Sequence, residues 1–266
     1  MITELPRLLG LLPPGTLPAG RLVRPEDGGP PVYWLSDEPV EPALWARLRS
    51  RHDDSGLWPL LLTGLPRDER RPWADGEVFP AHMTAPDLHD AAELLARWWA
   101  DRAEADEEED AGAEADRVAA TAPFGRRWPG LAEPGDPAGS AGHVAEPCPG
   151  NLLWAPARLG LVPASRGADT LALTGWSGPV NYVSDAGMLS AVVRSWEDRF
   201  GAQVVGLGFD TLHLAVAAPP TSPEHARRVA AEHFAFCPDN IEQGAGALTA
   251  YAGQIIGSDT WSFWWD

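Results

Sequence analysis

Hydrophobic and polar positions follow regular patterns over the second half of the chain, and these patterns predict strands and helices in succession. Leu212, Leu214 and Val216 alternate with small or polar neighbours, which is typical of a half-buried strand. Further strands are predicted by four short apolar stretches, at residues 159–162, 170–174, 204–207 and 261–265. In the last stretch, alternation places Trp261, Phe263 and Trp265 on one face, so we expect this tail to cover the hydrophobic core.

Helical periodicity separates these strands. Ser184 or Asp185 can cap a helix that ends at Gly201, and Ser222 precedes Pro223 at the start of a second helix. A third helix is predicted over residues 247–256. The order strand, strand, helix, strand, strand, helix, helix, strand contains a short turn that makes the central pair antiparallel. The sequence therefore predicts an α+β fold, with a mixed, largely antiparallel sheet and helices packed mainly on one face.

The first half of the chain gives a weaker pattern. A strand is predicted at residues 32–35, a helix from Pro42, and a buried strand at residues 57–62, whose Pro59 indicates an edge position or a bulge. Residues 64–83 have the composition of a loop. Thr84 is predicted to cap a helix that continues toward Trp99.

Composition shifts divide the chain into four parts. Residues 1–83 are a Pro- and Gly-rich region with small α/β elements, and residues 84–120 form a helix that runs into an acidic block at residues 101–116. We expect that block to be a solvated helix or disordered, because its like charges repel. Residues 121–150 are predicted to be a linker and residues 151–266 a C-terminal α+β domain. Whether residues 1–83 fold independently stays open.

Charge restricts the classes of partner. The 266 residues carry a formal net charge of −18, so nucleic acids and acidic membranes are not expected as partners. All 20 basic residues are arginine, which fits a coding bias of the genome better than an arginine-specific role. The start of the chain lacks a basic segment followed by a long apolar run, and the apolar stretch at residues 57–62 is too short to span a bilayer. We therefore expect a cytoplasmic protein.

Three segments carry a resemblance to a known family. They are residues 196–202, the run Cys237-Pro238-Asp239, and the terminal Trp-x-Phe-Trp-Trp-Asp of residues 261–266. With these motifs the C-terminal half resembles an uncharacterised bacterial family, domain of unknown function 4253, and residues 52–62 are similar to a companion segment of that family. The resemblance implies a shared fold and no particular activity.

Cysteine and histidine residues leave two chemical alternatives open. His233 and Cys237 have a spacing at which both could approach one metal, and His143 with Cys148 would complete a four-ligand zinc site. The alternative is a core histidine beside a buried thiol, which we favour, so no metal and no cofactor are expected.

A hydrolase site is a further alternative. Asp210, His213 and Asp239 offer a carboxylate and an imidazole for general-base catalysis. Ser177 is the candidate nucleophile, but its surroundings lack the second glycine of a nucleophile elbow. Asp210 is more simply a turn residue and His213 a polar position on a strand.

Thirteen tryptophans direct attention to aromatic recognition. Trp176 lies in a predicted loop and is expected to be exposed there. The predicted binding residues lie in two segments far apart in the sequence: Trp176, Asn181, Tyr182, Asp239 and Gln243.

Two functions of different class follow. The first is a non-enzymatic protein-binding module, of immunity or regulatory type, that holds a protein partner through its acidic surface and loop aromatics. The alternative is a small-molecule enzyme with a hydrolase-like site near Trp176, Asn181, Asp210, His213 and Asp239. The sequence favours the first and leaves the oligomeric state open.

Overall fold

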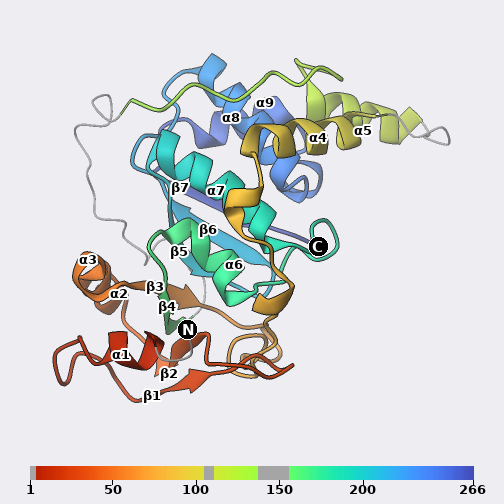
Figure 1. Ribbon diagram of the computed structural model, residues 1–266. Coiled ribbons are helices and arrows are strands. Elements are labelled where there is room, and N and C mark those ends of the chain that lie inside the picture. The colour runs from red at the N-terminus through yellow and green to blue at the C-terminus, as the bar shows by residue number, and fades with distance from the viewer. Residues whose placement is uncertain (1–3, 105–110, 137–155) are drawn as a thin grey trace.

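A single mixed β-sheet organises the part of the chain that the computed structural model describes, residues 4–104, 111–136 and 156–266 (Figure 1). Its seven strands follow the order β1-β2-β4-β3-β5-β6-β7. Neighbouring strands run antiparallel, except for the parallel pair β3 and β5. The strands are β1 Gly20–Val23, β2 Tyr33–Pro39, β3 Leu57–Leu62, β4 Arg158–Pro163, β5 Gln203–Leu207, β6 Thr211–Ala215 and β7 Thr260–Trp264. The predicted α+β fold with a largely antiparallel sheet is confirmed.

Helices lie mainly over one face of this sheet. The helices of the first half are α1 Glu4–Leu9, α2 Pro42–Arg49, α3 His52–Ser55, α4 Ala91–Ala103 and α5 Ala111–Thr121. Those of the second half are α6 Thr170–Thr174, α7 Ala186–Phe200, α8 Pro223–Phe236 and α9 Leu248–Ile255. Single turns of 3₁₀ helix lie at Pro80–His82, Pro86–Leu88 and Gly167–Asp169, and a π-helical turn lies at Asn240–Ala245. No helix within the described ranges is long and apolar enough to cross a membrane.

The alternation of side chains along the strands divides the core between the two faces. Trp58 and Leu60 of β3 pack into the main cluster beneath α4, α7, α8 and α9, whereas Leu57 joins a smaller cluster with helices α1 and α2. Figure 1 shows α4, α7, α8 and α9 grouped together and α1, α2 and α3 at the opposite end of the view. Strands from residues 1–83 share the sheet with strands from residues 151–266. The division into separate domains stays a prediction.

Pro59 lies in a central strand, so its predicted edge position is wrong. β3 pairs with β4 along its whole length, but it pairs with β5 only from Leu61 onward. The carbonyl of Pro59 accepts a hydrogen bond of 2.8 Å from the Trp45 indole, so this backbone unit faces away from β4. The missing N–H of Pro59 therefore removes no bond from the ladder.

Two further sequence predictions are wrong. The run Thr170–Thr174 forms helix α6, not a strand, and Gly175 ends it in the left-handed conformation with φ 72°. The helix predicted from Thr84 begins only at Ala91, where the carboxylate of Asp90 accepts from the N–H of Glu93. Thr84 instead donates its hydroxyl to Asp185, 101 residues away.

The acidic block and the predicted linker are described only in part. Helix α4 ends at Ala103, and residues 105–110 and 137–155 lie outside the described residues. Residues 122–136 form a loop, as predicted, and this loop is hydrogen-bonded to helices α7 and α8. The N–H of Ala132, for example, donates to the buried Glu232 over 2.6 Å.

Glu232 forms the centre of a buried ion pair. Its carboxylate is fully buried and accepts from both terminal nitrogens of Arg199, over 2.8 and 2.6 Å. The indole of Trp196 donates to the same carboxylate over 2.7 Å. Together with the N–H of Ala132, these donors satisfy the charge that burial would otherwise leave costly. Trp196 and Arg199 both belong to the motif of residues 196–202, which therefore fixes α7 to α8.

The aromatic tail covers the core as predicted. Trp261, Phe263 and Trp265 are buried, while Ser262 is exposed and Trp264 is half-buried. The Phe263 ring stacks on Trp196 at 5.4 Å. β7 is thus the last strand of the sheet and closes the main hydrophobic cluster.

Candidate functional site

Two loops that are far apart in the sequence meet beside the end of β7. One joins α6 to α7, and the other follows α8. The hydroxyl of Tyr182 donates to Oδ1 of Asp239 over 2.8 Å, and the amide of Asn181 donates to the backbone oxygen of Asp266 over 3.0 Å. Gln243 joins the same group by donating to Asp239 over 2.9 Å. Four of the five predicted binding residues therefore lie together, and their role in binding stays a prediction.

The carboxylate of Asp239 acts as the anchor of this group. The residue is 1% exposed. Besides Tyr182 and Gln243, the backbone N–H of Asp266 donates to it over 3.0 Å. Three donors around a buried carboxylate satisfy its charge and fix its orientation. Asp239 therefore holds the two loops and the tail together and offers no free oxygen edge to solvent for general-base catalysis.

Tyr182 is the exposed aromatic residue of the group. Its side chain is 37% exposed, and the neighbouring Val180 is 56% exposed. Burial of the hydroxyl and its bond to Asp239 raise the pKa of Tyr182 to about 12, so the phenol stays protonated. The guanidinium of Arg102 lies 5.1 Å from the ring centroid. This cation–π contact and the hydrogen bond hold the ring in one orientation.

Arg102 was not recognised in the sequence, because it lies within the acidic block. Its Nε donates to the carbonyl of Ala235 over 3.3 Å, which ties α4 to the end of α8. Burial lowers the pKa of Arg102, although Glu242 and Tyr182 oppose this effect. Arg102 therefore contacts one face of the Tyr182 ring and helps to hold it in place.

Trp176 is buried, so the expectation of an exposed loop aromatic is wrong. Its indole N–H is shared between the carbonyls of Gly208 and Phe209, at 3.0 and 3.3 Å. Its ring meets Trp265 edge to face at 5.6 Å. The left-handed Gly175 turns the chain inward directly before Trp176, and this turn directs the indole into the core.

Cys237 and Asn240 fasten the outer edge of β7. The thiol of Cys237 donates to the carbonyl of Trp264 over 2.9 Å. The amide of Asn240 donates to the carbonyl of Ser262 over 2.7 Å and accepts from the N–H of Trp264 at 3.3 Å. These side chains take the place of a neighbouring strand and protect the edge. Asn240 was not recognised in the sequence, although it directly follows the Cys237-Pro238-Asp239 run.

His233 is a core histidine. Its Nδ1 lies 3.0 Å from the hydroxyl of Tyr251, and the rings of Trp196, Trp261 and Phe263 surround it within 5 Å. Burial lowers the pKa of His233 to about 3 and raises that of the Cys237 thiol to about 12. Both groups are therefore neutral at physiological pH.

The four-ligand zinc alternative is tested only in part. In the portion of the chain that the structure describes, no group of three or more His, Cys, Asp or Glu residues could hold a metal ion. His143 and Cys148 lie outside that portion.

The residues proposed for a hydrolase site do not form a catalytic pair. His213 is buried, its Nδ1 lies 3.0 Å from the hydroxyl of Ser262, and burial lowers its pKa to about 4. Among the described contacts no hydrogen bond joins His213 to Asp210 or Asp239. Ser177 lies elsewhere, in a hollow of about 290 Å³ that it lines with Arg71 and Phe209 among others. Asp210 accepts the N–H of Trp265 through its backbone oxygen.

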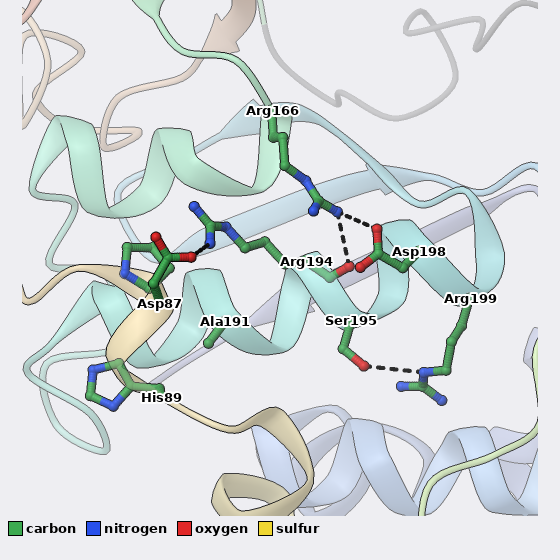
Figure 2. A pocket seen from close by; sticks show the side chains of 9 residues that line it. Asp87, His89, Arg166, Ala191, Arg194, Ser195, Asp198 and Arg199 are labelled. Carbon is green, nitrogen blue, oxygen red and sulfur yellow. Dashed lines mark hydrogen bonds and ion pairs between the residues drawn. The ribbon is translucent and has the colours of Figure 1, made fainter.

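A second hollow, of about 400 Å³, is lined by Arg194 and Arg199 of helix α7 and by Arg166, which directly precedes the 3₁₀ turn Gly167–Asp169 (Figure 2). Arg194 donates to Asp87 and Asp169, and Arg166 donates to Glu197 over 2.9 Å and to Asp198 over 2.5 Å.

Arg199 is held by Glu232, as described above. Carboxylates thus neutralise all three arginines of the hollow, and the pKa values of Arg166 and Arg194 are raised by these partners. The hollow is therefore an ion-paired junction between helices and not a site for an anion. Each of these ion pairs joins a residue of α7 to a residue outside that helix, so the spacing of charges along α7 did not predict them.

Comparison with known proteins agrees with the resemblance carried by the three motifs. The chain matched no curated protein and no solved structure. The companion segment at residues 52–62 lies outside the range that a family model matches. Residues 158–266 match the family model described as domain of unknown function DUF4253.

Proposed function

We propose that the protein is a non-enzymatic protein-binding module, of immunity-like or regulatory type, that holds a basic partner at the Tyr182 surface. We define this surface as Val180, Asn181, Tyr182, Glu242 and Gln243. All five residues are exposed. The observation that carries the proposal is the hydrogen bond by which the buried carboxylate of Asp239 holds the exposed Tyr182 side chain in place.

A fixed ring favours binding, because side chains normally lose conformational entropy when they become ordered in an interface. A tyrosine already held by a hydrogen bond and by the Arg102 guanidinium loses little on binding. Aromatic residues in fixed positions beside apolar contacts, here Val180, are typical centres of protein interfaces.

Charge indicates the nature of the partner. Glu242 belongs to the surface and Asp266 lies beside it, bonded to Asn181. The chain as a whole carries a net charge of −18. This negative field attracts a basic protein surface and repels an acidic one.

The small-molecule enzyme is the less supported function. Trp176, Asn181, Asp210 and Asp239 all contact residues 265–266. His213, however, is neutral and bonded to Ser262, and Asp239 already accepts three hydrogen bonds. The imidazole of His213 and the carboxylate of Asp239 thus take part in structural hydrogen bonds, which leaves them poorly suited to proton transfer.

The proposal is tested by affinity capture from the native host at low and high salt. The wild-type protein is compared with the variants Tyr182→Ala and Glu242→Gln. The control is Leu22→Ala on β1, a similarly exposed residue outside the Tyr182 surface. We expect a discrete protein to be retained by the wild type and by Leu22→Ala at low salt, and to be lost with Tyr182→Ala.

Circular dichroism of each variant establishes that it is folded. Retention of the same protein by folded Tyr182→Ala, or retention of no protein by the wild type at low salt, overturns the proposal. Retention that does not weaken at high salt would contradict the basic character of the partner.

A further inference from the structure

An apolar groove lies between α1, the loop that joins β1 to β2, and α6. Its volume is about 460 Å³, which falls within the range of small-molecule sites. Leu5, Val32, Val162 and the 44% exposed Leu173 form its apolar walls. It shares no lining residue with the Tyr182 surface.

Prolines give this groove an unusual hydrogen-bonding character. The six that line it are Pro6, Pro25, Pro30, Pro31, Pro80 and Pro163. A proline has a carbonyl acceptor, lacks an N–H donor and has a fixed φ angle. The walls are therefore stiff, and they are richer in acceptors than in donors.

Nearby backbone donors are already used within the protein. The N–H of Gly28 donates to the carbonyl of Pro25 over 3.1 Å, and the N–H of Val32 donates to Val23 over 2.9 Å. Gly28 adopts a φ of 94°, which closes the loop into this tight turn. A ligand that needs to accept hydrogen bonds thus finds few free backbone donors here.

The charged residues of the groove also favour a ligand that carries hydrogen-bond donors. Glu4 and Asp27 line it, and none of the described lining residues is basic. The nearest basic side chain on the loop, Arg24, donates to the carbonyl of Gly29 over 2.6 Å and does not line the groove. A ligand with an apolar body and a cationic group therefore complements both the apolar walls and the carboxylates of Glu4 and Asp27.

We propose that this groove is a binding site for a small apolar cation. Its hydrocarbon body fills the space between the prolines and Leu173. Its ammonium group faces the carboxylates of Glu4 and Asp27. The ligand class is an aryl- or alkylammonium ion.

Three probes that share one hydrocarbon body test the selectivity by isothermal titration calorimetry on the full chain. They are 4-phenylbutylamine, which is a cation at neutral pH, 4-phenylbutanol and 4-phenylbutyrate. We expect saturable binding of one amine per chain and binding of the alcohol that is about fivefold weaker, as for the loss of a surface charge contact of roughly 1 kcal/mol. The carboxylate should give no saturable heat. Equal affinities for the three probes, or no binding of the amine, would overturn the proposal.

Two variants locate the site. Leu173→Arg places a cation in the groove at an exposed position and should abolish binding of the amine, whereas Leu88→Arg, at a 73% exposed position outside the groove, should leave it unchanged. The double variant Glu4→Gln with Asp27→Asn should bind the amine and the alcohol equally. If Leu173→Arg does not fold, the double variant decides, and a preference for the amine that survives in it contradicts the site.

Discussion

The hydroxyl of Tyr182 donates to the buried carboxylate of Asp239 over 2.8 Å, across 57 residues of sequence. This bond joins the loop before α7 to the turn after α8, and the same carboxylate accepts the N–H of Asp266. One buried charge therefore organises an exposed aromatic, a π-helical turn and the end of the last strand.

Replacing Tyr182 with phenylalanine tests the energetic part of this relationship. The variant keeps the ring but leaves Asp239 with two donors in place of three. We expect the free energy of unfolding to fall by roughly 1–3 kcal/mol, as for a buried charged acceptor that loses a partner. Urea denaturation of Tyr182→Phe against the wild type measures this, with Leu88→Ala as the exposed control. Identical midpoints for Tyr182→Phe and the wild type would mean that the bond does not hold the loops.

The buried Glu232 and Arg199 should behave differently from a surface ion pair. Glu232→Gln leaves the largely buried guanidinium of Arg199 without its counter-charge, so we expect a loss of about 3–5 kcal/mol in the free energy of unfolding. In the matched control, Arg21→Gln removes an exposed pair with Asp37 and should cost roughly 0–1 kcal/mol. Similar losses in both variants, from chemical denaturation curves, would argue against the structural role of the 196–202 motif.

Two buried histidines predict how stability depends on pH. Burial lowers the pKa of His213 to about 4 and that of His233 to about 3, from the ordinary value of 6.5. Unfolding exposes both and restores their ordinary pKa values, so below pH 6.5 the unfolded chain binds more protons than the folded protein. Their contribution to stability is therefore complete above that pH and is lost as the pH falls.

Below this pH we expect a decrease that approaches about 1.4 kcal/mol per pH unit for each histidine. Urea denaturation between about pH 7 and pH 5 measures the slope. In His213→Gln we expect the slope of the unfolding free energy against pH to decrease by the contribution of one histidine. A slope in this variant equal to that of the wild type would show that His213 does not titrate on unfolding.

The thiol of Cys237 should be inert in the folded protein. It is buried, it donates to the carbonyl of Trp264, and burial raises its pKa to about 12. In a Cys148→Ser background, a thiol reagent at mildly alkaline pH should label no cysteine in the native state and one after denaturation. Asn240→Ala, which loosens the edge of β7, should speed the reaction. Prompt labelling of the native protein would contradict the closed edge.

The sequence contained the signals for elements whose ends carry local hydrogen bonds. Asp185 accepts from the N–H of Gly187 at the start of α7, and Gly201 ends that helix with φ 60°, both as predicted. The alternation of Trp261 and Phe263 with Ser262 correctly predicted the buried face of β7. In each case a few adjacent residues determine the structure.

Errors arose where tertiary contacts decide. Thr170–Thr174 is too short for periodicity to separate a strand from a helix, and its packing against α7 favours the helix. Thr84 has the composition of a cap but bonds to Asp185 instead. Pro59 reads as an edge residue, yet β5 pairs with β3 only beyond it.

Four members of the candidate site were predictable from the sequence, whereas Arg102, Asn240 and the geometry were not. Both loops contained the polar and aromatic residues that meet, including Tyr182 and Asp239. Their meeting depends on how α7 and α8 pack, and no local pattern encodes that packing. For the same reason Trp176 was expected at the surface, a position that Tyr182 occupies instead.

The affinity of the captured partner for the Tyr182 surface tests the central claim most directly. The dissociation constant is measured by biolayer interferometry for the wild type, Tyr182→Ala and the control Leu22→Ala. We expect Tyr182→Ala to raise it about 30-fold, as for a central interface residue worth roughly 2 kcal/mol, and Leu22→Ala to leave it unchanged. Equal dissociation constants for the wild type and a folded Tyr182→Ala protein would contradict the account.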